Sequence, residues 1–293
     1  MLLEIRPVTM SNTENAKSPS WLVVQIKYAL DSQQLRRALL DIWDGWTKRN
    51  LWTTIGLHDV RQRYRRSVIG PFWITLSTGI MIGALGFLYS HIFKIDMKEY
   101  LPFLAAGFFV WGLISSLVIE GCQAFNSSEN LIKQLSAPLS IYVYRVLWSN
   151  LLTAAHNVWI FVLVAFFFSV QINWSIVLVA PALALILLNG LWVGLLLGLL
   201  SARFRDIPLI VSNIIQVMFF MTPVIWRADM LPERVLLLYA NPFYHFVEIL
   251  RAPMLGNAPS AENWLSTLSI TVVGWVIALA FYTAYRWRIA YWV

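Results

Sequence analysis

Long uncharged stretches, separated by short charged interruptions, dominate the chain from residue 67 onward. No charged residue occurs in 67–93, in 100–119 or in 146–202. A helix rises about 1.5 Å per residue and the hydrocarbon core of a bilayer is about 30 Å thick, so about 20 apolar residues cross it. The pattern therefore predicts an all-α integral membrane protein.

Six segments have the length and apolar character of membrane spans. We predict them at 68–93, 101–119, 142–169, 174–200, 207–226 and 264–285. The uncharged residues between Arg145 and Arg203 would make a helix about 85 Å long, so this stretch must turn, and the polar residues 171–174 are the best place. Pro71 and Pro208 lie near the starts of the first and fifth spans, where proline costs a helix least.

The segment between the fifth and sixth spans is neither an ordinary loop nor a span. Its 13 uncharged residues, 235–247, are interrupted by Asn241 and Pro242. Such a length is too short to cross a bilayer, and it favours a re-entrant or interfacial hairpin on the external face. We expect an external gate segment over about 228–258. The alternative is an amphipathic loop helix lying on the membrane surface.

Positive charge predicts the orientation of the spans. The side that holds both termini and the loops after spans two and four carries 17 Lys and Arg residues, and the other side carries 5. Because cytoplasmic loops are enriched in Lys and Arg, we expect both termini to be cytoplasmic. Several tryptophans also lie near predicted span ends, as aromatic belts do.

The region before the first span divides into two parts. Residues 1–34 are predicted to form a variable, disordered arm, because the first 20 are polar. Residues 35–66 carry leucine, isoleucine and tryptophan at helical spacing with basic residues between them. This pattern predicts an amphipathic helix in the cytoplasmic membrane interface, followed by a six-span domain over 67–293.

Four arginines end the predicted interface helix, directly before the first span. They are Arg61, Arg63, Arg65 and Arg66. The simpler interpretation is a topology anchor on anionic headgroups. The alternative is that the cluster also meets an anionic lipid substrate, since arginine forms charge-assisted bonds to phosphate.

Composition and missing motifs exclude several function classes. Hydrophobic residues make up 59% of the chain and charged residues 13%, with a net charge of +7 and one cysteine. The sequence has no G-x-x-x-x-G-K-[ST] loop for ATP, no His/Cys metal cluster and no G-x-S-x-G elbow. We therefore expect no catalysis, metal or cofactor in this chain, and no nucleic-acid partner.

The middles of the predicted spans contain no Asp, Lys or Arg. An ion-coupled transporter usually keeps an acidic residue near mid-membrane. This absence favours a permease that is powered from outside the chain.

Three runs of sequence, in order, resemble the polysaccharide-exporting ABC permeases, most closely their O-antigen type. The first is H-D-V-R-Q-R-Y-R-R-S-V-I-G-P-F-W at 58–73. The second joins F-R-D-I-P at 204–208 to F-F-M-T-P-V at 219–224. The third consists of N-P-F-Y at 241–244 and R-A-P at 251–253. The resemblance covers residues 36 to 290, without the N-terminal arm.

The resemblance implies a half-transporter of the bacterial inner membrane. Two copies would form the channel, and two copies of a separate ATPase subunit would bind ATP and Mg²⁺ and drive transport. The substrate would be a polysaccharide built on undecaprenyl diphosphate, which would meet the arginine cluster where it enters from the surrounding membrane lipids.

The family's permeases bind their ATPases through cytoplasmic helices, for which this chain offers two segments. The first is a predicted helix over 126–135, with Asn and Ser caps and an apolar stripe, and the second is the loop 201–207. The candidate contact residues are Ser127, Glu129, Asn130, Leu131, Lys133, Arg203, Arg205 and Asp206. Alternatively, the helix packs on its own bundle.

Aromatic side chains are the candidates for a sugar path, because rings stack on sugar faces without fixing one register. The chain has 15 Trp, 11 Tyr and 17 Phe. Candidate lining residues are Phe72, Trp73, Phe87, Tyr89, Phe219, Phe220 and Trp226. Candidate external gate residues are Asn241, Pro242, Phe243, Tyr244 and Phe246. The alternative is that these aromatics face lipid.

Other functions remain open at this point. A capsule or teichoic-acid exporter would use the same machine, although a polyanionic teichoic acid would favour more basic residues along the path. A lipid or drug efflux permease would share the fold. A scaffold or membrane enzyme is disfavoured by the missing catalytic motifs.

Overall fold

The computed structural model describes residues 32–63, 65, 72–230 and 236–293, and in these ranges the regular structure is helical without strands. The helices are α2 (Ser32–Thr47), α3 (Arg49–Arg63), α4 (Phe72–Phe93), α5 (Met97–Cys122), α6 (Glu129–Gln134), α7 (Ser140–Phe167), α8 (Val179–Arg203), α9 (Ile207–Met221), α10 (Leu236–Tyr239), α11 (Pro242–Met254), α12 (Ala261–Tyr285) and α13 (Ile289–Trp292). The all-α prediction is confirmed. Residues 1–31 of the predicted arm and Arg66 lie outside the described residues.

Among the described residues, five helices are long and apolar enough to cross a membrane: α4, α5, α7, α8 with the short turn before it, and α12 with the short helices after it. They correspond to five of the six predicted spans. The chain is therefore a multi-pass membrane protein.

The fifth predicted span, 207–226, corresponds to α9, which ends at Met221 and has only 15 residues. At 1.5 Å per residue this is about 22 Å, less than the bilayer core of about 30 Å. Thr222 has extended backbone angles (φ −95°, ψ 137°), as expected for a residue before a proline, here Pro223. The predicted C-terminal end of this span is therefore wrong, and the sixth crossing stays a prediction.

The turn predicted at 171–174 is confirmed. Helix α7 ends at Phe167 and Ser169 adopts a left-handed φ of 53°. The chain restarts at a 3₁₀ turn, Trp174–Leu178, which Asn173 caps by accepting the backbone N–H of Ser175 at 2.9 Å. The long uncharged stretch is thus divided into two helices.

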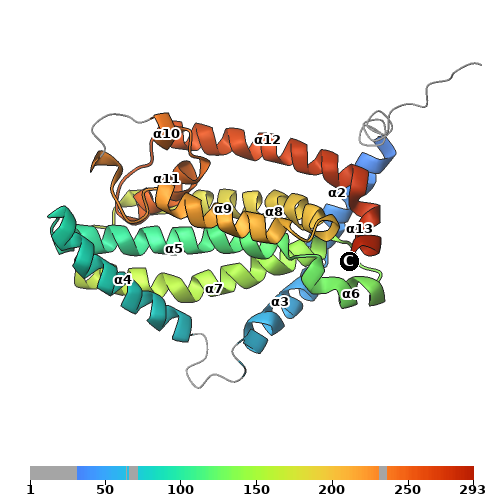
Figure 1. The fold of residues 1–293 in the computed structure, drawn as a ribbon, viewed down its shortest axis with the longest axis horizontal. Coiled ribbons are helices and arrows are strands. Elements are labelled where there is room, and N and C mark those ends of the chain that lie inside the picture. The colour runs from blue at the N-terminus through green and yellow to red at the C-terminus, as the bar shows by residue number, and fades with distance from the viewer. Residues whose placement is uncertain (1–31, 64, 66–71, 231–235) are drawn as a thin grey trace, which may run out of the picture.

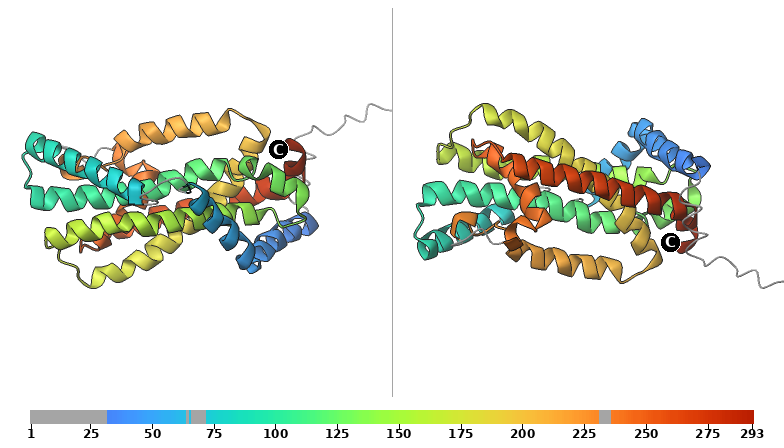
Figure 2. Two further views of the ribbon diagram at one scale, coloured as in Figure 1. Left: turned by 90° about the horizontal axis from the view of Figure 1, so that it is seen from below. Right: turned by 90° about the horizontal axis from the view of Figure 1, so that it is seen from above.

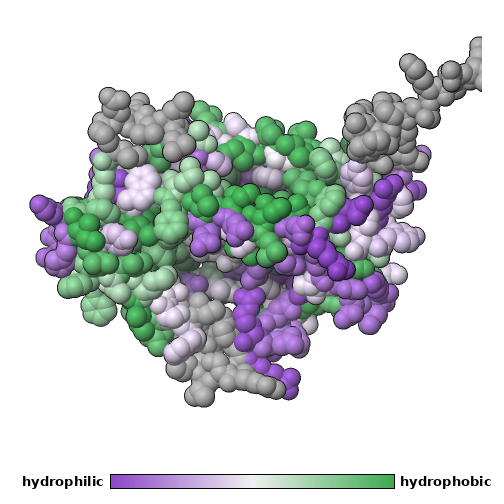
Figure 3. Space-filling model, viewed as in Figure 1, coloured by the Kyte–Doolittle hydropathy of each residue, from purple (hydrophilic) through white to green (hydrophobic). Residues whose placement is uncertain are grey.

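The long helices run side by side along the longest axis of the molecule (Figure 1). Helix α5 packs against α7, α8 and α4, and α12 packs against α8. Two glycines permit a close approach of the α5 and α8 backbones, because a Cβ on Gly121 of α5 would lie 3.2 Å from the Cα of Gly194 in α8. On the face seen in Figure 3, a mainly apolar band separates hydrophilic residues at the end with α2, α3 and α6 from a smaller group near the α4–α5 turn.

The segment predicted as one interface helix consists of two, α2 and α3, which meet at Lys48. Both lie at one end of the bundle and rest on α7 (Figure 2). Gly45 lies so close to α7 that an added Cβ would come within 2.1 Å of the Ser140 hydroxyl. The outer face of α2 leaves Trp43 and Trp46 more than half exposed. Such a face suits a membrane interface.

The opposite end of the bundle holds α10 and α11, which follow α9 in the chain (Figure 1). Helix α11 packs against α5 and α12. Asn241 caps α11 by accepting the backbone N–H of Phe243 at 3.0 Å, and Pro242 fills the first helical position. Two short helices, α10 and α11, thus occupy the predicted gate segment, and the re-entrant hairpin itself stays a prediction. The depth of these helices in the membrane and their action as a gate also stay predictions.

Candidate functional site

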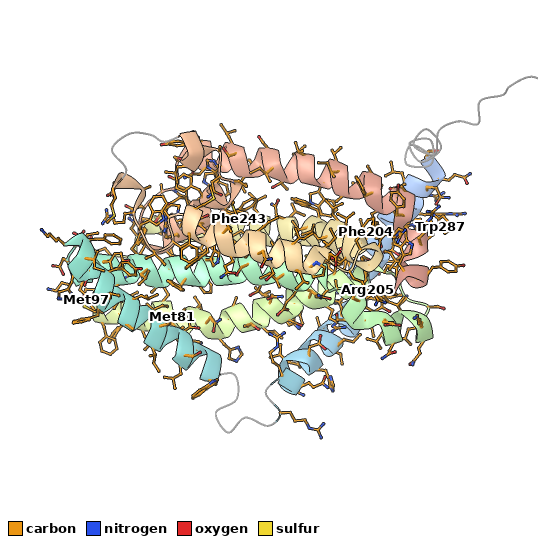
Figure 4. The ribbon with its side chains drawn as sticks, in the orientation of Figure 1. Met81, Met97, Phe204, Arg205, Phe243 and Trp287 are labelled. Atoms are coloured by element: carbon orange, nitrogen blue, oxygen red, sulfur yellow. The ribbon has the colours of Figure 1, made fainter. Side chains whose placement is uncertain are left out.

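The two segments predicted to contact an ATPase meet at the α2 end of the bundle. The 3₁₀ turn Asn126–Ser128 leads into α6, and Asn126 donates a hydrogen bond of 3.3 Å to the carbonyl of Ser201 at the end of α8. A pocket of about 500 Å³ lies between them, lined by both segments and by Trp292 of α13. Figure 4 places Phe204, Arg205 and Trp287 at this same end. Contacts between residues this distant in sequence could not be read from the chain alone.

Most of the predicted contact residues are exposed on this face. Those exposed are Ser127, Glu129, Asn130, Lys133, Arg203, Arg205 and Asp206. Lys133 donates to Glu129 at 2.7 Å, and this hydrogen bond, with the charges of Lys133 and Arg205, lowers the pKa of Glu129. The charged side chains are therefore available to a partner.

The apolar stripe predicted on the same helix is divided. Leu131 and Ile132 are half-buried against the chain's own apolar cluster, while Leu135 is 44% exposed. One side of α6 therefore packs on its own bundle, as the alternative predicted, and its polar side faces outward.

Ser128, expected to cap this helix, makes no capping hydrogen bond. Its hydroxyl donates to the carbonyl of Ala124 at 2.7 Å and accepts from Arg145 of α7 at 2.9 Å. The guanidinium of Arg145 also forms an ion pair with Asp59 of α3. Neither Arg145 nor Asp59 was singled out from the sequence, where Arg145 marked only a span end.

Arg63 of the predicted arginine cluster lies beside a polar cleft. Arg63 donates to Glu120 of α5 at 3.0 Å, and the other oxygen of Glu120 accepts from Asn150 at 2.8 Å. Arg61 and Arg65 are exposed. The cleft, of about 440 Å³, lies between α3, α5 and α7 and is bordered by the Arg63 and Arg145 side chains.

Asp41 fixes α2 to the bundle. Its carboxylate accepts the backbone N–H groups of Leu139 and Ser140 at 3.1 and 3.0 Å, and the hydroxyl of Tyr282 at 2.7 Å. It therefore caps α7 from another helix and places a negative charge at the positive end of the α7 dipole. Sequence reasoning missed this residue, because its partners are distant in the chain.

The predicted lining aromatics of α4 fall into two groups. Trp73 and Phe87 are exposed, whereas Tyr89 is half-buried and stacks on Phe93 with ring centroids 5.4 Å apart. The side chain of Phe72 lies outside the described residues. Only the outward side chains of α4 are thus placed to meet a substrate, a second copy or lipid.

On α9, Phe220 is 65% exposed, and its carbonyl accepts the indole N–H of Trp226 at 3.1 Å. Phe219 points inward and contacts Trp111 with ring centroids 5.6 Å apart. Phe243 of the predicted gate contacts the same Trp111, also at 5.6 Å. Trp111, buried in α5, therefore joins a predicted lining residue to a predicted gate residue.

The other predicted gate residues are mostly held in place. Asn241 is buried and donates to the Thr222 hydroxyl at 2.9 Å, which ties the start of α11 to the end of α9. Phe246 is buried, Tyr244 is half-buried and Pro242 is exposed.

Arg251 is one of the five basic residues counted on the external side. It lies within α11 and is 2% exposed. The guanidinium pairs with Glu248, donates to the carbonyl of Pro223 and lies 4.1 Å from the ring centroid of Phe103. These partners satisfy the buried charge and bind α11 to α5 and to the loop after α9.

Comparison with known proteins identifies the family of this chain. Residues 50–255, from α3 to just past the end of α11, match the family model of the ABC-2 type transporter. The chain is 24% identical over 250 residues to an O-antigen export system permease protein RfbA of Klebsiella pneumoniae, covering 82% of this chain and 94% of that protein. It is 23% identical over 233 residues to the protein of the same name from Myxococcus xanthus, covering 77% and 88%. The chain belongs to the ABC-2 type transporter family.

Proposed function

We propose that this chain is the membrane subunit of an ATP-driven ABC exporter. Its substrate would be an undecaprenyl-diphosphate-linked polysaccharide of the O-antigen type, carried across the bacterial inner membrane. The observation that carries the proposal is the meeting of α6 and the loop Phe204–Asp206 at one end of a bundle of apolar helices. Family membership and the names of the similar proteins support it.

The machine would contain two copies of this chain and two ATPase subunits. ATP and Mg²⁺ would be held by those subunits, because this sequence has no P-loop. Six spans per copy require α9 and the residues after it to complete a crossing, which would leave both termini on the cytoplasmic side. The exposed charges of α6 and of the loop Phe204–Asp206 would face the ATPase.

The diphosphate would approach the arginines at the end of α3. Arg61 and Arg65 are exposed there, and Arg63 is held by Glu120 at the edge of the polar cleft. A diphosphate accepts several charge-assisted hydrogen bonds, so it can compete for Arg63. The exposed aromatics of α4 and α9 would then meet the sugar chain, and α11 would close its external end.

Disruption of this gene in its native host tests the proposal. We expect long undecaprenyl-linked polymer to accumulate inside the cell and surface polymer to disappear, measured by fractionating lipid-linked glycans and by labelling intact cells. Wild-type gene supplied on a plasmid should restore both. Normal surface polymer would contradict the proposal and favour small-substrate efflux, whereas loss of a capsule or teichoic acid would correct the substrate.

A further inference from the structure

One side chain connects the proposed ATPase-docking helix to the helix that carries the arginine cluster. Arg145 lies in the second turn of α7, and its Nη1 donates to the Ser128 hydroxyl, directly before α6, at 2.9 Å. Its Nε donates to the carboxylate of Asp59 on α3. The Arg145 and Asp59 side chains are only 13% and 25% exposed. The guanidinium thus bridges two segments that have no other polar link to one another among the described contacts.

Asp59 and Arg63 lie four residues apart, so they share one face of α3. While Asp59 binds Arg145, Arg63 binds Glu120 of α5 at 3.0 Å. The C-terminal half of α3 is therefore held to the bundle by two ion pairs, and the arginine cluster continues directly from it.

The contact of α3 with α7 changes character along the helix. At Gly56 the helices touch closely, since an added Cβ would lie 3.0 Å from the Trp148 ring and 3.1 Å from the Arg145 carbonyl. Beyond Gly56 the contact combines the buried Val60 side chain with the ion pairs of Asp59 and Arg63, and it borders the cleft of about 440 Å³. Because the cleft leaves space beside this contact, the far end of α3 can shift about Gly56 with Val60 as the buried apolar side chain that must repack.

We propose that Arg145 is a positioning residue that couples α6 to α3. This inference rests on the proposed function. Engagement of α6 by the ATPase would move Ser128, Arg145 would follow, and its ion pair with Asp59 would move the arginines at the end of α3 relative to the lipid diphosphate. A partly buried ion pair suits this role, because it is directional and less screened than a surface pair.

Three substitutions separate coupling from folding. Arg145→Gln removes the charge and keeps a hydrogen-bonding side chain, and Asp59→Asn does the same for its partner. Ser128→Ala leaves the ion pair intact and removes the link from Arg145 to α6, together with the hydroxyl's local bond to the Ala124 carbonyl. Arg227→Gln is the control, because it is the same substitution as at Arg145. It breaks more exposed pairs, with Asp229 and Glu99, at the opposite end of the molecule, where such pairs contribute little.

The measurement is polymer translocated per ATP hydrolysed, by the assembled complex in proteoliposomes. We expect Arg145→Gln, Asp59→Asn and Ser128→Ala to lower this ratio on the order of tenfold, the size of a typical coupling between sites, while assembly and ATP hydrolysis persist. The exchanged pair Asp59→Arg with Arg145→Asp should recover part of the loss, because it restores the ion pair, while a merely structural role would lower assembly or ATP hydrolysis together with the ratio. An unchanged ratio in Ser128→Ala and in Arg145→Gln would overturn the proposal.

A distance measurement distinguishes failure of the coupling from failure of the proposed function. Spin labels at Gln62→Cys and Trp174→Cys, in a Cys122→Ala background, report the end of α3 against the opposite end of the molecule; both sites are exposed. We expect a nucleotide-dependent shift that Arg145→Gln and Ser128→Ala abolish, whatever polymer is carried. If the labels do not shift in the otherwise unsubstituted complex, the coupling is refuted. If they shift as expected but no polymer moves, only the proposed substrate fails.

Discussion

At the scale of single residues, polar side chains at the α2 end fix how the helices meet. Asp41 accepts three hydrogen bonds from two helices, and its side chain is 10% exposed. Arg251 plays the corresponding role at the other end, where it holds α11. In both cases the charge is accepted inside the fold because every partner is present, so removal of one member leaves others unsatisfied.

Replacement of Asp41 by alanine should therefore destabilise the protein. Two backbone N–H groups of α7 and the Tyr282 hydroxyl would lose their acceptor, which we expect to cost about 1–3 kcal/mol. Asp44→Ala is the matched control, because Asp44 is an exposed carboxylate on the same helix. Thermal unfolding of the purified protein in detergent measures the difference, and an equal melting temperature for the two variants would contradict the assigned role of Asp41.

At the scale of elements, close glycine contacts determine which helices can touch. Gly45 brings α2 onto the start of α7, and Gly56 brings α3 onto its second and third turns. Without a side chain at these positions the backbones approach closely, which small residues permit between helices in membrane proteins. The α2–α3 pair is therefore placed by shape as well as by charge.

A methyl group at Gly45 should push α2 away from α7. In Gly45→Ala the new Cβ would lie 2.1 Å from the Ser140 hydroxyl, whereas in Gly112→Ala nothing lies within 4 Å of the new atom. We expect faster proteolysis of α2 and a lower melting temperature in Gly45→Ala only. Gly112→Ala should be neutral or slightly stabilising, since alanine favours a helix over glycine by about 1 kcal/mol. Similar behaviour of the two variants would show that the Gly45 contact is dispensable.

The charge-free runs predicted most of the long helices. The two differences, the end of α9 and the division of the interface segment, have local causes. Pro223 shortens α9, and the break at Lys48 divides the interface segment, neither of which changes average hydropathy. Most of the predicted docking residues are exposed, whereas Leu131 is half-buried against the bundle. The pairs Asp41–Tyr282 and Asp59–Arg145 join residues far apart in the sequence, so no local sequence pattern predicts them.

At the scale of the whole molecule, the proposed function assigns some of the exposed aromatic residues to the polymer path and leaves others outside it. Trp73, Phe87 and Phe220 are exposed on α4 and α9, which we assign to the polymer path, while Phe166 and Phe167 are exposed at the end of α7. Both groups are more than half exposed in one copy of the chain, so exposure does not distinguish them. Their difference must come from what each helix meets in the assembled exporter.

Combined replacement of Trp73, Phe87 and Phe220 by alanine should lower export several-fold without loss of ATPase assembly, since sugar rings would lose their stacking surface. The matched variant Phe166→Ala with Phe167→Ala removes aromatics of similar exposure and should export normally. Surface polymer on intact cells and co-purification of the ATPase are the two measurements. Equal export by both variants would contradict the prediction that these aromatic residues line the polymer path.

The central claim is that this chain and its ATPase carry a lipid-linked polysaccharide across a membrane. The most direct test is reconstitution of both subunits in proteoliposomes that hold undecaprenyl-diphosphate-linked polymer in the outer leaflet, with the ATPase outside. We predict that ATP and Mg²⁺ render the polymer resistant to an added glycosidase, and that an ATPase subunit unable to hydrolyse ATP abolishes this protection. ATP hydrolysis with the polymer still fully cleavable would contradict the account.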